Sequence, residues 1–180
     1  MAERLNPLFD ELIQLQQEKR LPPVDAWQPP RTASIDIRID ADGTWYHEGE
    51  PIRRKPLVKL FATILRRDAD GFCLVTPAEK LLIEVVDAPF LAVDMEVRGA
   101  GADQEILLVT NVDDAVMLDD GHPLRVAGLP DAPRPYVRVR GGLDALIARS
   151  VYYRLVDLCE GPDAGGAFTL RSCGAQFRLG

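Results

Sequence analysis

The sequence contains few of the residues that build metal and redox centres. Its three cysteines are Cys73, Cys159 and Cys173, and they form no Cys-x-x-Cys pair. Only His47 and His122 add imidazole groups, so the composition argues against a zinc site. A chain of 180 residues buries enough surface to fold without disulfides, and we expect its thiols to be reduced.

Long apolar runs are missing as well. Residues 1–20 mix charged and apolar side chains without an uninterrupted hydrophobic stretch. We therefore expect neither a signal peptide nor a membrane-spanning segment, and we expect the protein to be cytoplasmic.

Basic residues are fewer than acidic residues. Lysine and arginine number 21 against 28 acidic residues, and the formal net charge is −7. Such a surface repels the phosphate backbone of nucleic acid and anionic membranes, so we expect neither as a partner. A small anion bound in a local basic pocket is compatible with this charge.

One motif occurs twice. Residues 42–52 read DGTWYHEGEPI, and residues 114–124 read DAVMLDDGHPL, with aspartate, glycine, proline and a branched aliphatic residue in register. Each copy precedes a helix-like apolar pattern, at Pro56–Arg66 and at Leu143–Cys159, and then a glycine and two short strand-like runs. This order predicts a duplicated unit of hairpin, helix and hairpin, with a seam between the copies where a ligand often binds.

The predicted fold class is α+β, with mainly antiparallel sheet and one helix in each repeat. Strict alternation in Ser34–Asp40 predicts a half-buried strand. Before it, Asn6-Pro7 predicts the start of an amphipathic helix that ends near Arg20, and a proline-rich strap follows. The predicted domains are an N-terminal helix with its strap (1–32), a first repeat (33–100) and a second repeat (101–180).

A family resemblance is carried by residues of both repeats. They include Ile35–Ile39, Gly43-Thr44-Trp45, Leu74–Pro77, Asp87–Phe90, His122–Arg125, Pro135-Tyr136 and Ser172-x-Gly174. Over nearly the whole chain beyond the N-terminal helix, the sequence resembles domain of unknown function family 1285 of the proteobacteria. The resemblance implies two similar subdomains, of which the C-terminal one is loosely like a pleckstrin-homology domain. It also implies a nucleotide-like ligand at the subdomain interface and a role in signal transduction, and it supplies no catalytic residues.

Arg53-Arg54-Lys55 directly precedes the helix that Pro56 is predicted to start. Cations at that position oppose the helix dipole, whereas a phosphate or carboxylate would be favoured by the exposed amides and the basic side chains together. The alternative is that acidic residues of the preceding hairpin neutralise the run in solvated pairs. We favour that alternative for Arg53 and Lys55 and keep Arg54 as a ligand-binding candidate.

Arg138 and Arg140 are predicted to share one face of a strand that leads through Gly141-Gly142 into a helix. Two guanidinium groups could then converge on helix-start amides, and Arg125 lies near them in sequence. The alternative is that the two glycines form an ordinary tight turn. We take Arg125, Arg138 and Arg140 as ligand-binding candidates.

The remaining candidates lie in the first repeat. Thr76, Glu79 and Lys80 surround a proline turn and could form a rigid ligand-facing corner, or simply a hairpin loop. For Trp45 we favour core packing, with stacking on a base as the alternative that makes it a ligand-binding candidate.

Two classes of function remain open. A small-ligand sensor, with a nucleotide-like anion as the expected class of ligand, is favoured because basic residues precede predicted helices while the sequence shows no recognisable nucleophile, metal cluster or P-loop. We therefore expect no enzymatic activity. The runner-up is an adaptor whose pleckstrin-homology-like half binds a protein partner by strand addition to an exposed sheet edge.

Overall fold

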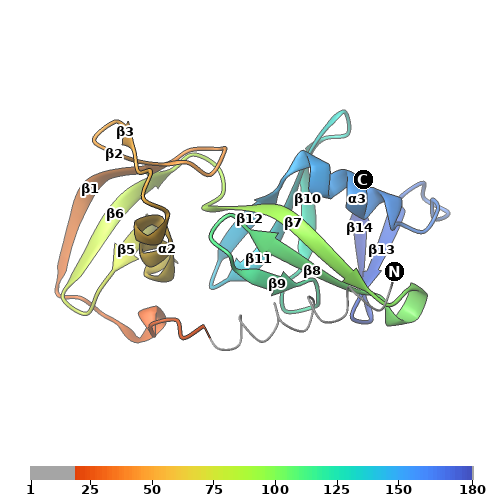
Figure 1. Cartoon of the computed structure of the whole chain (residues 1–180), viewed down its shortest axis with the longest axis horizontal. Coiled ribbons are helices and arrows are strands. Elements are labelled where there is room, and N and C mark those ends of the chain that lie inside the picture. Colours follow the sequence, from red (N-terminus) through yellow and green to blue (C-terminus); the bar gives the residue numbers. More distant parts are fainter. Residues whose placement is uncertain (1–18, 180) are drawn as a thin grey trace. The chain divides into compact units, whose positions relative to one another are not determined.

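The computed structural model describes residues 19–179, which form two compact units (Figure 1). The first unit comprises residues 19–89 with residues 141–143, and the second comprises residues 90–140 and 144–179. None of the described helices is both long enough and apolar enough to cross a membrane.

The first unit is a six-stranded sheet with one α-helix. Its elements are η1 (Val24–Ala26), β1 (Arg31–Ile39), β2 (Trp45–His47), β3 (Glu50–Pro51), α2 (Lys55–Thr63), β4 (Leu65–Asp68), β5 (Gly71–Val75) and β6 (Glu79–Val85). Strands β1-β2-β3 form one antiparallel meander and β4-β5-β6 form another. Because β1 pairs in parallel with β6, the two meanders make one sheet of order β3-β2-β1-β6-β5-β4.

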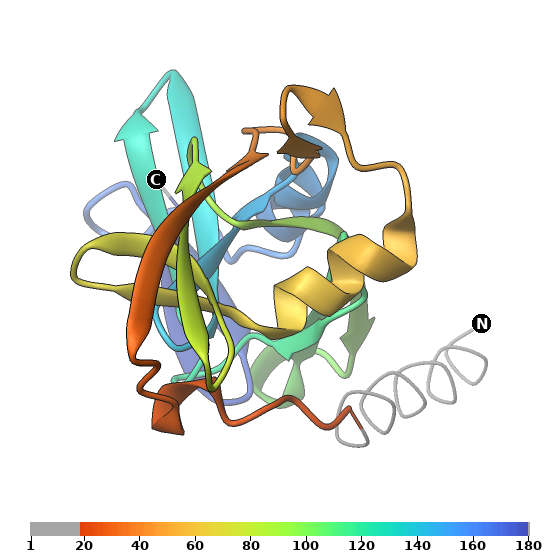
Figure 2. The same ribbon diagram turned by 90° about the vertical axis from the view of Figure 1, so that its left-hand side faces the viewer.

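The core of the first unit follows from the alternation along β1. Ile37 and Ile39 are buried while Asp36 is exposed, which confirms the predicted half-buried strand. Helix α2, golden in Figure 2, packs its Phe61 ring on the buried Trp45 ring, with centroids 6.2 Å apart. The helix ends at Thr63, earlier than the predicted Arg66, because Leu65 is fully buried in strand β4 opposite β5.

The second unit is a second six-stranded sheet with one α-helix and a separate hairpin. Its elements are β7 (Phe90–Arg98), η2 (Gly101–Asp103), β8 (Glu105–Thr110), β9 (Ala115–Met117), β10 (Leu124–Leu129), β11 (Ala132–Arg140), β12 (Leu143–Ile147), α3 (Arg149–Asp157), β13 (Phe168–Ser172) and β14 (Ala175–Leu179). The sheet order is β10-β11-β12-β7-β8-β9, and β7 pairs in parallel with β12.

The two units are similar, as the duplicated sequence pattern predicts. In the first sheet β1 pairs in parallel with β6, and in the second sheet β7 pairs in parallel with β12. Each of these pairs joins the first strand of one antiparallel meander to the last strand of the next meander. The details differ from the prediction. Strand β7 belongs to the second sheet, so the predicted boundary after residue 100 falls instead at Pro89. Pro51 lies in β3 but Pro123 lies between β9 and β10, so the repeated Gly-x-Pro motifs do not occupy equivalent positions.

The helices also occupy different places in the two units. Helix α2 lies between the meanders, whereas α3 follows the second meander of its unit. The predicted helix Leu143–Cys159 is wrong in its first part, because Leu143–Ile147 is strand β12. Gly141 and Gly142 both have positive φ, 47° and 81°, which is the geometry of a two-residue hairpin turn. The predicted N-terminal helix falls largely within residues 1–18, outside the described residues.

Side-chain contacts fix α3 and the β13-β14 hairpin on the second sheet. Val151 and Leu155, one turn apart on α3, are fully buried. Arg154 donates to Asp94 Oδ1 at 2.6 Å and to the Met95 carbonyl at 2.7 Å on β7. Ser172 Oγ of β13 accepts a hydrogen bond from the Ile106 amide at 2.9 Å. The helix and the hairpin are therefore rigid supports for the surfaces between them.

Candidate functional site

The candidates predicted from sequence divide between the two units. Trp45, Arg54, Thr76, Glu79 and Lys80 belong to the first unit. Arg125, Arg138 and Arg140 belong to the second.

Arg54 is the N-cap residue of α2. Its carbonyl accepts hydrogen bonds from the Leu57 amide at 3.0 Å and the Val58 amide at 3.2 Å, while its side chain is exposed. The first turn of α2 carries Lys55 and no acidic residue, so no carboxylate of this turn balances the positive end of the helix dipole. This end of α2 would favour a bound anion.

The corner at Thr76 is organised by its own hydrogen bonds. Thr76 Oγ1 accepts from the Glu79 amide at 3.1 Å and donates to the Glu79 carbonyl at 3.3 Å. Lys80 Nζ forms ion pairs with Asp68 at 2.8 Å and Asp70 at 2.7 Å. Hydrogen bonds to Asp68 and Asp70 raise the pKa of the Lys80 ammonium. The charge of Lys80 is therefore already compensated within the first unit.

An arginine that the sequence analysis missed anchors the proline-rich strap. Arg66 donates from Nη1 to the carbonyls of Val24 at 2.7 Å and Trp27 at 2.8 Å, and it forms a two-bond pair with Asp68 at 2.7 and 2.8 Å. The Arg66 hydrogen bonds, followed by that of Lys80, lower the pKa of Asp68 to about 2. Val24 and Trp27 precede Arg66 by 42 and 39 residues, so local sequence carries no signal for these two contacts.

Trp45 is 1% exposed and stacks on Phe61. Its buried Nε1 has no hydrogen-bond partner among the described residues. The geometry fits the core-packing alternative for this side chain, since a ligand could not reach the indole ring without displacing α2.

Two candidates of the second unit converge on one carboxylate. Arg138 Nε donates to Asp144 Oδ1 at 2.6 Å, and Arg125 Nη2 donates to Asp144 Oδ2 at 3.0 Å. The Arg125 guanidinium also lies over the Tyr136 ring, 4.3 Å from its centroid. The side chains of Arg125 and Arg138 are 56% and 41% exposed, whereas that of Asp144 is 11% exposed. Two accessible cations thus share one nearly buried anion.

Arg140 has a different environment. Its Nη1 donates to Asp114 Oδ2 at 2.7 Å, and its guanidinium lies 5.1 Å from the centroid of the Phe90 ring. Gly141-Gly142 leads into strand β12 and not into a helix, so the predicted convergence of Arg138 and Arg140 on helix-start amides does not occur.

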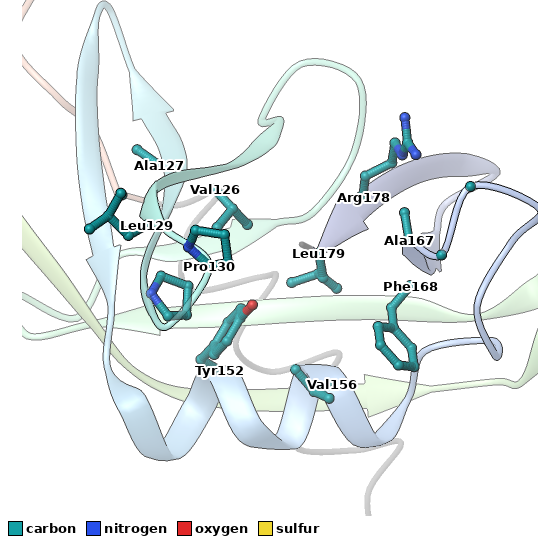
Figure 3. Close-up of a pocket in the computed structure, with 14 residues that line it drawn as sticks. Val126, Ala127, Leu129, Pro130, Tyr152, Val156, Ala167, Phe168, Arg178 and Leu179 are labelled. Carbon is teal, nitrogen blue, oxygen red and sulfur yellow. The ribbon is translucent and has the colours of Figure 1, made fainter.

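A groove that the sequence analysis did not identify lies beside α3 in the second unit (Figure 3). It has a volume of about 820 Å³, and Tyr152 and Val156 project into it from α3. Its lining residues are Val126–Pro130, Pro133, Tyr152, Val156, Gly165–Phe168, Arg178 and Leu179. We call it the α3 groove. The sequence held one partial signal for this groove. Tyr152 and Val156 each come directly after a buried residue of α3, Val151 and Leu155, and so lie beside its buried face.

Burial and a neighbouring carboxylate set the environment of two thiols and of His122 among the described residues. Burial raises the pKa of the Cys159 thiol to about 11 and also raises the pKa of Cys73. His122 Nδ1 lies 3.0 Å from Asp119 Oδ1 in a turn. Within residues 19–179, no cluster of three or more histidine, cysteine or acidic side chains could hold a metal ion.

Two solved structures are similar to this chain. A DUF1285 family protein from Silicibacter pomeroyi DSS-3 is 47% identical, with a TM-score of 0.83 and 93% of each chain covered. A DUF1285 family protein from Shewanella baltica OS155 is 28% identical, with a TM-score of 0.53, and the match covers 67% of this chain and 90% of that one. Comparison with curated proteins gives no match.

Family models match nearly all the described residues. The N-terminal domain of DUF1285, a domain of unknown function, matches residues 22–88, and the DUF1285 C-terminal domain matches residues 89–179. The junction between the two matches coincides with the boundary between the two structural units at Pro89. The chain therefore belongs to the DUF1285 family.

Proposed function

We propose that this protein is a non-enzymatic binding protein for a small anionic ligand of the nucleotide-like class, and that it acts as a sensor in cytoplasmic signal transduction. The observation that carries the proposal is the convergence of Arg125 and Arg138 on Asp144. One carboxylate neutralises only one of two guanidinium groups, so this cluster has one positive charge in excess. A bound anion would neutralise that excess positive charge.

The geometry of the cluster suits a phosphate. Arginine forms paired, charge-assisted hydrogen bonds to phosphate oxygens, and both guanidinium groups retain exposed N–H donors while Asp144 occupies one side of each. Tyr136 holds the Arg125 guanidinium by stacking, so less side-chain entropy is lost when a ligand binds. The outer face of that guanidinium offers a planar surface on which a base can stack.

The thiols of the described residues and His122 favour binding over catalysis. A thiol with a pKa near 11, such as Cys159, is almost fully protonated at neutral pH and is a poor nucleophile. His122 is held by Asp119 in a turn, and no serine, threonine or cysteine side chain is hydrogen bonded to its ring within the described chain.

A thermal-shift panel of mono-, di- and cyclic nucleotides, with inorganic phosphate as the minimal anion, tests the proposal. A ligand at about 100 times its Kd stabilises the folded state by about 2.7 kcal/mol, which raises the Tm of a chain of this length by about 5–10 °C. Arg125→Ala and Arg138→Ala should each abolish the shift. Arg149→Ala, which removes another exposed arginine of the second unit, is the matched control and should keep it.

Arg54→Ala distinguishes the two basic sites predicted from sequence. A shift that disappears in Arg54→Ala but persists in Arg125→Ala and Arg138→Ala would place the ligand at the start of α2. No shift with any member of the panel at millimolar concentration would contradict the small-anion function.

A further inference from the structure

The α3 groove presents a mostly apolar lining next to the edge of a sheet. Strand β10 is the terminal strand of the order β10-β11-β12-β7-β8-β9, and its residues Val126–Leu129 form one wall of the groove. Tyr152 and Val156 of α3 lie opposite that wall (Figure 3). An edge strand next to an apolar groove is the arrangement in which proteins bind extended peptides.

The hydrogen-bond register shows which backbone groups of β10 point toward the edge that faces away from β11. The Arg138 amide donates to the Pro123 carbonyl at 3.1 Å, so this opposed pair is a hydrogen-bonded pair. Hydrogen-bonded and non-hydrogen-bonded pairs alternate along an antiparallel ladder. The backbone N–H and C=O groups of Val126 and Gly128 therefore point away from β11.

Proline positions on β11 agree with this register. Val126 is opposite Pro135, and Gly128 is opposite Pro133. Proline has no N–H to donate, so it is accommodated in non-hydrogen-bonded pairs. The outward donors and acceptors of Val126 and Gly128 are two residues apart, which is the spacing that an added strand requires.

The rim of the groove exposes large apolar side chains. Leu129 is 68% exposed and Phe168 is 42% exposed, and both line the groove. Along an added strand every second side chain would point toward this apolar lining, since successive side chains alternate between the two faces. The groove therefore selects a segment in which alternate residues are apolar.

One basic side chain adds charge selectivity. The Arg178 side chain is 69% exposed at the rim, and its Nη2 lies 3.5 Å from Asp163 Oδ2. Asp163 Oδ1 accepts hydrogen bonds from the amides of Gly165 at 2.8 Å and Ala167 at 3.0 Å, so loop amides already stabilise this carboxylate. The Arg178 guanidinium keeps most of its donors available to an acidic residue.

We propose that an extended segment of a partner protein, with alternating apolar side chains and an acidic residue, adds to the edge of β10 and fills the α3 groove. The acidic residue pairs with Arg178. Val126–Leu129 would pair with three or four residues of the segment, at a rise of about 3.3 Å per residue. This interaction goes beyond anion binding at Arg125 and Arg138 and depends on different residues.

Selection from a phage-displayed library of random nonapeptides on the immobilised full chain tests the proposal. The expected result is enrichment of sequences with apolar residues at alternate positions and an acidic residue near one end. An enriched peptide is then synthesised with a fluorescein label, and its Kd is measured by fluorescence anisotropy. A selection that enriches no sequence, or that enriches basic sequences, overturns the proposal.

Surface variants then locate the peptide. Leu129→Asp should weaken binding at least tenfold, and Arg178→Glu should weaken it at least fivefold. Leu60→Asp is the matched control, because Leu60 is 58% exposed on α2 of the first unit and should leave the Kd unchanged. Equal binding to Leu129→Asp and Leu60→Asp overturns the proposal. Light scattering gives a further test. If the free chain is a dimer and Leu129→Asp converts it to monomers, a second copy of the chain occupies the groove and the proposal is overturned.

Backbone pairing is tested without changing the protein. Copies of the selected peptide carry N-methyl groups on either the odd or the even amides. Strand addition predicts that one copy loses at least tenfold in affinity while the other binds as before, because alternate amides point toward β10. Equal binding of both copies overturns strand addition.

Discussion

Arg140 Nη1 lies 2.7 Å from Asp114 Oδ2, and the Asp114 side chain is 1% exposed. A buried carboxylate that has lost its water shell depends on its charged partner, and removal of that partner takes away the opposite charge that offsets the cost of burial. Arg140→Ala should therefore lower the free energy of unfolding by about 3–5 kcal/mol, measured by urea denaturation. Combining Arg140→Met with Asp114→Asn should restore much of the lost free energy of unfolding, since neither charge remains.

Arg138→Ala provides the comparison for that measurement. Its partner Asp144 keeps the hydrogen bond from Arg125 at 3.0 Å, so the carboxylate retains one charged partner. The cost should be about 1 kcal/mol, as for a partly exposed ion pair. If the two single variants lost equal stability, the distinction between a structural Arg140 and an accessible Arg138 would be wrong.

The aromatic pair of the first unit gives a second prediction. Trp45 is fully buried, whereas Phe61 is only half-buried on α2. Trp45→Ala should cost about 3–5 kcal/mol through lost contacts and a cavity, and Phe61→Ala should cost clearly less. Urea midpoints of the two variants measure the difference. A larger loss for Phe61→Ala would mean that α2 and not the sheet supplies the centre of this core.

The end of α2 shows what the sequence could and could not predict. Periodicity located both the α2 helix and the half-buried β1 strand, because each pattern is local. It placed Leu65 in the helix, although Leu65 pairs with Leu74 in β4-β5. Short apolar runs fit either period, and the run itself does not show the strand pairing that decides between them.

The same limit applies to the candidate site. Arg125 and Arg138 were identified as basic residues, but Asp144 was assigned to a helix and its role as their shared partner was not predicted. Gly141-Gly142 was the relevant signal for the strand that carries Asp144. Two adjacent glycines can form a hairpin turn as readily as they can precede a helix, and here both have positive φ and form the turn before β12. The α3 groove is built from four separate segments, so no single stretch of sequence describes it.

Thiol reactivity provides a third prediction. Burial raises the pKa of Cys159 to about 11, so at pH 8 only about one thiol in a thousand is ionised. Cys173 is exposed and Cys73 is buried, and both thiols also have raised pKa values. Iodoacetamide at pH 8 should therefore modify Cys173 first and all three slowly relative to a free thiol, as followed by mass spectrometry. Preferential modification of Cys159 would contradict the assigned burial.

Acid stability gives the last prediction, at the Arg66–Asp68 pair. The hydrogen bonds from Arg66, followed by that from Lys80, lower the pKa of Asp68 from 3.8 to about 2 in the folded state. A carboxyl with a depressed folded-state pKa stabilises the fold above its unfolded pKa, and this stabilisation is lost as the pH falls from about 4 to about 2. Solvent screening limits the contribution to about 1–2 kcal/mol. The free energy of unfolding of wild type and Asp68→Asn, measured at pH 6, 4 and 2, should differ most at pH 6 and converge at pH 2. Because Arg66 also holds the carbonyls of Val24 and Trp27, Asp68→Asn should increase proteolytic cleavage within residues 21–30. A constant difference between the two proteins across this pH range would show that the ionised form of Asp68 is not what stabilises the fold.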